Sequence, residues 1–72
     1  MTFEQFLATR EIQVVDETSA NHYFAVGGQL WTFITTSSGC AVQADKELAV
    51  DYCDDVAVAE RLLYLNSGAA AL

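Results

Sequence analysis

The residues that could do chemistry in this 72-residue chain are few: one histidine, His22, and two cysteines, Cys40 and Cys53. A cysteine beside a histidine can act as a nucleophile. The histidine and the two cysteines, together with one carboxylate, could bind zinc. Zinc ligands usually come in close pairs such as Cys-x-x-Cys, and the chain has no such pair. We therefore predict no catalytic residue, no metal site and no cofactor. We expect His22 to begin a strand and to stack beside Phe33.

Two other motifs have a weak resemblance to ligand sites. Asp51, Asp54 and Asp55 lie within five positions, as calcium ligands do, but the glycine and final glutamate of a calcium loop are missing. Carboxylates also favour the N-terminus of a helix, which explains this cluster better. Gly27-Gly28 is followed by neither a Lys-Ser/Thr pair nor a helix, so it does not indicate a phosphate-binding loop.

Acidic side chains dominate the charge of the chain, which has three basic and ten acidic residues and a net charge of −7. This charge argues against direct binding to nucleic acid, whose phosphates would repel it. Most of the acids fall between positions 45 and 60. We take these six, with two tyrosines, as the candidate partner-binding residues: Asp45, Glu47, Asp51, Asp54, Asp55, Glu60, Tyr23 and Tyr52. The alternative is that the acidic surface only keeps a small apolar domain in solution.

The clearest structural signal is a β-hairpin. Two β-rich runs, 22–26 and 29–35, are separated by Gly27-Gly28, a pair that suits the positive backbone angles of a two-residue turn. With these glycines as the loop, Phe24 pairs with Trp31 and His22 with Phe33, all on one side of the ribbon. That side has the larger aromatic area, so we expect it to face the core.

The remaining elements flank this hairpin. Thr2 and Gln5 form a capping-box pattern at the start of a short helix that reaches about Thr9. A β-branched run at 10–16 predicts a strand, and 36–39 predicts a turn. Positions 44–52 allow either a strand or a helix, and we favour strands. A helix is expected over 51–66, with Gly68 as a left-handed cap.

These elements predict an α+β fold: a short N-terminal helix, an antiparallel meander of three to five strands around the Gly-Gly hairpin, and a C-terminal helix packed on the sheet. We expect residues 1–68 to form one compact domain and residues 69–72 to fray. The acidic start does not resemble a secretory signal. The uncharged run 18–44 is too polar to span a membrane. We expect a cytoplasmic protein. Cys40 and Cys53 could form one bridge, but two free thiols are the more usual state in the cytoplasm.

The hairpin and the C-terminal helix have more apolar faces than one helical layer can cover. The excess area predicts either a homodimer or a protein partner, and area alone does not choose between them. A weaker third hypothesis is a small-ligand site formed by Trp31, Tyr23 and Tyr52 around His22.

In size, in its −7 charge, in its lack of an active-site motif and in the hairpin 24–31, the chain resembles the small acidic anti-CRISPR proteins of phages and mobile elements. The resemblance implies a stoichiometric inhibitor in the cytoplasm of the host cell. Such an inhibitor would bind a basic nucleoprotein effector and block its recognition of nucleic acid. The acids of segment 45–60 would then contact Lys and Arg of the target.

Overall fold

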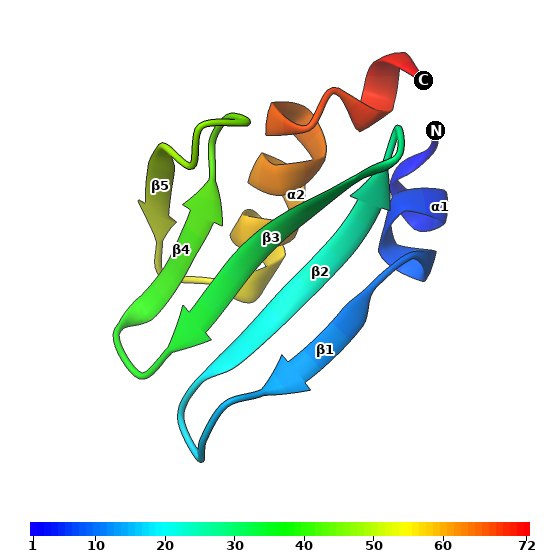
Figure 1. The fold of residues 1–72 in the computed structure, drawn as a ribbon. Coiled ribbons are helices and arrows are strands. Elements are labelled where there is room, and N and C mark those ends of the chain that lie inside the picture. The colour runs from blue at the N-terminus through cyan, green and yellow to red at the C-terminus, as the bar shows by residue number, and fades with distance from the viewer.

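The computed structural model describes all 72 residues, Met1–Leu72. An antiparallel five-stranded sheet in the order β1-β2-β3-β4-β5 is accompanied by helices at the two ends of the chain (Figure 1). The fold is α+β, as the sequence predicts. The elements are α1 (Phe3–Ala8), β1 (Glu11–Val14), β2 (Ala20–Val26), β3 (Gln29–Thr36), β4 (Gly39–Gln43), β5 (Val50–Cys53), α2 (Val56–Asn66) and the 3₁₀ turn η1 (Ala69–Ala71).

The hairpin of β2 and β3 has the predicted register. Phe24 pairs with Trp31 and His22 with Phe33, while Gly27 and Gly28 take positive φ angles of 58° and 79°. β2 begins two residues earlier than expected, at Ala20, because its start pairs with both β1 and β3. The predicted aromatic side of the ribbon is buried.

Helix α1 begins with the predicted capping box. The backbone N–H of Gln5 donates to the Thr2 hydroxyl, and the Gln5 side chain accepts from the Thr2 backbone N–H. A six-residue helix is unstable alone and needs tertiary contacts. Phe6 provides them, because its ring stacks on Phe24 with centroids 4.4 Å apart and planes at 3°.

Positions 44–52 differ from the expectation in detail. The strand interpretation is confirmed, because Val50–Cys53 pairs with β4. Leu48, however, does not belong to the strand: it lies in the β4–β5 loop with φ of 68° and is exposed. The helix expected over 51–66 begins only at Val56, because the residues before it form this edge strand.

The C-terminal end also differs. Gly68 takes the predicted left-handed conformation after α2, with φ of 73°. Residues 69–72, which we expected to fray, instead include η1, and Ala69 is fully buried. The Met1 amino group donates to the Leu72 carbonyl, so the two ends of the chain meet, as Figure 1 shows.

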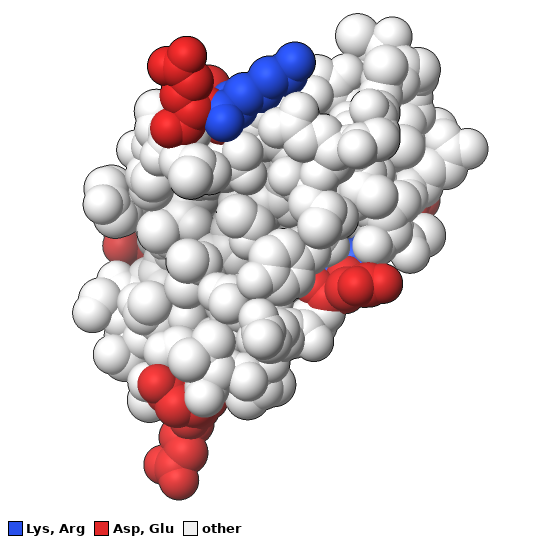
Figure 2. All heavy atoms as spheres, viewed as in Figure 1, with Lys and Arg blue, Asp and Glu red and all other residues white.

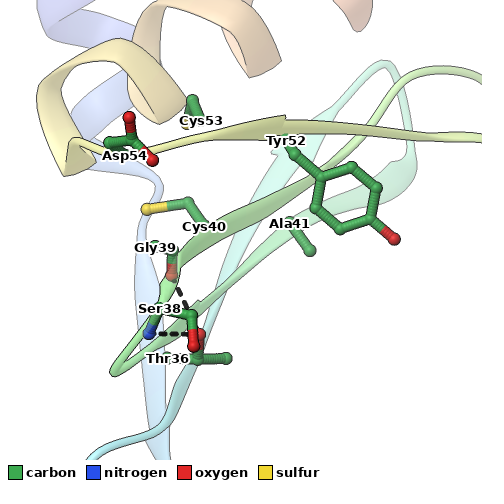
Figure 3. A pocket seen from close by; sticks show the side chains of 8 residues that line it. All are labelled: Thr36, Ser38, Gly39, Cys40, Ala41, Tyr52, Cys53 and Asp54. Atoms are coloured by element: carbon green, nitrogen blue, oxygen red, sulfur yellow. Dashed lines mark hydrogen bonds between the residues drawn. The ribbon is translucent and has the colours of Figure 1, made fainter.

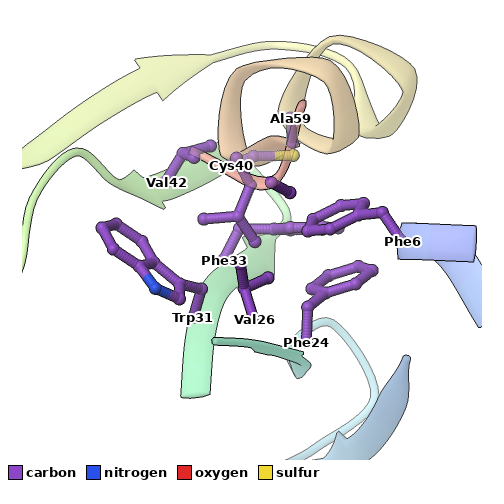
Figure 4. Close-up of a cluster of buried hydrophobic side chains, with 10 residues drawn as sticks. Phe6, Phe24, Val26, Trp31, Phe33, Cys40, Val42 and Ala59 are labelled. Carbon is purple, nitrogen blue, oxygen red and sulfur yellow. The ribbon is translucent and has the colours of Figure 1, made fainter. Parts of the chain in front are cut away.

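Both helices cover the same side of the sheet, and the core lies between them and the strands (Figures 1 and 4). α2 packs on β3, β4 and β5, while α1 packs on β2. The core consists of Phe6, Phe24, Val26, Trp31, Phe33, Cys40, Val42, Ala59, Leu63 and Ala69. No helix has the length and apolar character needed to cross a membrane.

Candidate partner-binding surface

The sheet face turned away from the helices has no element covering it. We call this surface the open face, and we define it by eight of the side chains that the register places there: Tyr23, Ala25, Leu30, Thr32, Ile34, Ala41, Val50 and Tyr52. The polar side chains of Gln13, Asn21, Thr36 and Gln43 share the same side of the sheet. Ile34 lies on the central strand, between Asn21 of β2 and Ala41 of β4. Tyr52 is 82% exposed and Leu30 is 63% exposed, so large apolar surface is in contact with solvent.

The open face is neutral and charged groups surround it. In Figure 2, which views the molecule from this side, Asp, Glu and Lys or Arg atoms lie only at the margins. Glu11 pairs with Tyr23 at the β1 edge. Asp54 lies beside Tyr52 at the β5 edge, and Glu47 lies in the β4–β5 loop. The carboxylates of Glu11, Glu47 and Asp54 form no ion pair and no side-chain hydrogen bond. We call Glu11, Glu47 and Asp54 the acidic rim.

The six predicted partner-binding acids do not gather on one face. Asp51 pairs with the buried residue Val42, so its side chain lies on the helix side, where it accepts from Asn66 Nδ2 at 3.1 Å. Asp55 caps α2 by accepting from the backbone N–H of Ala57 at 3.0 Å. Each of these two carboxylates therefore has a structural role.

Two more of the six carboxylates also stabilise the fold. Asp45 Oδ1 accepts from the backbone N–H groups of Glu47 and Ala49, at 2.8 and 3.2 Å, and so orders the β4–β5 loop. Glu60 forms an ion pair with Arg10. Only Glu47 and Asp54 of the predicted set are free of such contacts.

Sequence reasoning missed the Arg10–Glu60 pair. The two residues are 50 positions apart and join the start of β1 to α2. Arg10 also lies over the Phe24 ring, with its guanidinium carbon 5.2 Å from the centroid, and burial lowers the pKa of Arg10. No local pattern marks such a pair, because it depends on how the last helix crosses the sheet.

The two tyrosines of the predicted site are on the open face, but Trp31 and His22, the other two residues of the small-ligand hypothesis, are not. His22 and Trp31 point into the core, whereas Tyr23 and Tyr52 point to the opposite side of the sheet. Successive side chains of a strand alternate between faces, so the sheet itself separates the two pairs. The small-ligand hypothesis built on these four residues is wrong.

His22 stacks on Phe33 as predicted, with centroids 4.4 Å apart and planes at 12°. It is 8% exposed, and its Nδ1 is buried without a hydrogen-bond partner. Burial lowers the pKa of His22, and the positive charge of Arg10 lowers it further. The fold therefore favours the neutral imidazole.

This environment predicts a pH-dependent stability. Between the lowered folded pKa and the ordinary value of about 6.5, the unfolded chain binds more protons, so the free energy of unfolding falls as pH decreases below about 6.5. The free energy of unfolding should fall by at most about 1.4 kcal/mol per pH unit. Urea unfolding of the wild type and of His22→Phe between pH 7.5 and 5.5 tests this pH dependence. Equal slopes in the two proteins would exclude this role for His22.

A hollow of about 300 Å³ lies at the β3–β4 turn and the β5 edge (Figure 3). The residues that line it include Cys40, Cys53, Tyr52 and Asp54. The β3–β4 turn closes one end, where the Ser38 backbone N–H donates to the Thr36 hydroxyl at 3.1 Å. Sequence reasoning left open whether the two cysteines meet, and the structure places them directly opposite each other.

Comparison of the chain with protein-family models, with curated proteins and with solved structures found no match.

Proposed function

We propose that this chain is a non-catalytic protein-binding inhibitor that contacts its partner through the open face. The observation that carries the proposal is a neutral, apolar sheet surface, with Leu30, Ile34 and Tyr52 exposed and no element over it. Monomeric proteins rarely expose a large contiguous apolar patch without a binding role. A central apolar patch with a charged rim is also the usual anatomy of a protein interface.

The acidic rim indicates the chemistry of the partner. Glu11, Glu47 and Asp54 surround the open face without internal partners, and the net charge of the chain is −7. A complementary surface has an apolar centre and Lys or Arg at its edge. Such charges raise the rate of encounter and disfavour acidic competitors.

Basic surfaces of this kind occur where a protein holds nucleic acid. A chain bound to that basic surface would exclude the nucleic acid sterically. This is the anti-CRISPR-like inhibition that the general character of the chain implies. In this proposal the apolar open face supplies most of the affinity. The rim carboxylates steer the approach and take the place of phosphates at the partner's edge.

The second candidate is a homo-oligomer that buries the same face against another copy. Charge favours a different partner, because a symmetric dimer would bring two chains of −7, and two acidic rims, together. Sedimentation equilibrium at micromolar concentration, in low and high salt, separates the two candidates. We expect a monomer in both; a dimer that persists in low salt would establish the homo-oligomer.

Neutralising part of the rim tests the partner chemistry. The double variant Glu47→Gln/Asp54→Asn removes two unpaired carboxylates beside the open face. Immobilised wild-type and variant chains are exposed to a lysate of the encoding organism or its host, and the bound proteins are eluted with increasing NaCl. Basic proteins retained by the wild type should elute from the variant at lower salt.

The control is Glu4→Gln/Glu17→Gln, which removes the same charge from α1 and from the β1–β2 turn. Its elution profile should stay close to that of the wild type. If both double variants shift elution equally, net charge alone governs binding and the acidic rim has no specific role.

A further inference from the structure

The two thiols of the chain form a cross-strand pair. Cys40 of β4 and Cys53 of β5 are directly opposed in the antiparallel register, and both side chains are on the helix side of the sheet. Opposed residues have Cβ atoms about 4.5–5.5 Å apart. The neighbouring Cys53 also raises the pKa of the Cys40 thiol. Both thiols are free.

A small molecule can reach this pair. Cys40 is buried, whereas Cys53 is partly exposed at the edge of the sheet, and both residues are among those around the hollow drawn in Figure 3. The hollow has a volume of about 300 Å³, comparable to the smaller ligand pockets of proteins. Cys53 is therefore the more accessible of the two cysteines to a reagent.

We propose that Cys40 and Cys53 are a reversible oxidation site that takes a low-molecular-weight disulfide as its oxidant. The Cys53 thiolate attacks one sulfur of the small disulfide, which releases one small thiol and leaves a mixed disulfide on Cys53. The Cys40 thiol loses its proton as it attacks the Cys53 sulfur, and the second small thiol leaves. Two protein thiols are oxidised to one disulfide, and one small disulfide is reduced to two thiols.

The order of the two steps follows from the surroundings of the thiols. Burial, followed by the neighbouring Cys53, raises the pKa of Cys40 to about 11. The thiolate is the attacking species, so Cys40 is a poor first nucleophile. As a resolving thiol it acts on a sulfur already beside it, where proximity offsets its high pKa.

The geometry also allows the bond to form. A disulfide requires Cβ atoms about 3.5–4.5 Å apart, somewhat closer than opposed strand residues usually lie. β5 can move to close this distance, because it is a four-residue edge strand paired only with β4. We expect the bond to form under oxidant and to open again in excess thiol.

The test treats the native protein with glutathione disulfide, blocks the remaining thiols by alkylation and measures the intact mass. We expect both free thiols to be lost, the mass to fall by two hydrogen atoms, and no glutathione to remain attached. Trypsin cleaves after Arg10, Lys46 and Arg61, so peptides 11–46 and 47–61 should then be recovered as one linked species. Dithiothreitol should separate them.

Two single variants test the order of attack. Cys40→Ser should stop with one glutathione on Cys53, because the resolving thiol is missing. Cys53→Ser should react at least ten-fold more slowly, because only the buried thiol is left. Glutathione retained on the wild type, disulfide-linked dimers, or an unreactive native wild type would each overturn the proposal.

Discussion

Phe24→Ala should remove most of the stability of the domain. The Phe24 ring is fully buried, stacks on Phe6 of α1 and lies 5.7 Å from the Phe33 centroid. It also lies beneath the Arg10 guanidinium. Truncating a buried phenylalanine costs about 3–5 kcal/mol. A domain of this size has a free energy of unfolding of only about 4–11 kcal/mol.

Urea unfolding followed by far-ultraviolet circular dichroism measures this effect. We expect a large drop in the midpoint, or a chain that is partly unfolded without urea. Leu30→Ala is the control, because Leu30 is 63% exposed on the open face and should change stability by less than about 1 kcal/mol. Similar losses in both variants would contradict the assignment of the two faces.

Gly39→Ala should displace β5 from the sheet. Gly39 begins β4 with φ of 131°, and a Cβ there would lie 2.6 Å from the Cys53 carbonyl oxygen. Alanine therefore meets an unfavourable backbone conformation and a clash with backbone atoms of the edge strand. The two effects together should cost at least about 2 kcal/mol.

Gly28→Ala separates these two contributions. Gly28 also has positive φ, at 79°, but nothing lies within 4 Å of the added Cβ. The Gly28→Ala variant should lose only the conformational part of the stability, about 1 kcal/mol. In amide hydrogen exchange, Gly39→Ala should expose the β5 amides while Gly28→Ala leaves them protected. Equal exchange at β5 in the two variants would contradict the close approach of β5 to Gly39.

The central hairpin was predictable because its loop has only two residues. Once Gly27-Gly28 is the turn, every pair in β2 and β3 follows, and with it the buried side of the ribbon. The capping box of α1 was predictable for the same reason, because Thr2 and Gln5 act within one helical turn.

The opposition of Cys40 and Cys53 was not predictable. It depends on the length and conformation of the β4–β5 loop, where Asp45 holds two backbone N–H groups and Leu48 takes a positive φ. A different loop of similar composition would shift the register and separate the thiols. Loop geometry of this kind leaves no periodic signal in the sequence.

The candidate site was predicted only in part. The excess of apolar surface was visible from the alternation of the hairpin, and both Tyr23 and Tyr52 lie on the open face. The capping role of Asp55 followed from the sequence, but the roles of Asp51 and Glu60 did not, because their partners lie on distant parts of the chain. Counting charges along a segment does not show which carboxylates already have hydrogen-bond or ion-pair partners within the fold.

In the proposed function, the partner binds the open face. Ile34→Asp tests it most directly, because Ile34 is 39% exposed on the central strand and its neighbours are neutral. A carboxylate there would have to be desolvated in the interface, so binding should weaken at least ten-fold. Val58→Asp is the matched control, since Val58 is 46% exposed on α2, on the other side of the sheet.

The measurement is quantitative mass spectrometry of the proteins retained by the three immobilised chains, each first shown to be folded by circular dichroism. We expect at least one basic protein to be retained by the wild type and by Val58→Asp but lost with Ile34→Asp. Retention that survives Ile34→Asp and disappears with Val58→Asp would place the contact on the helices and contradict it.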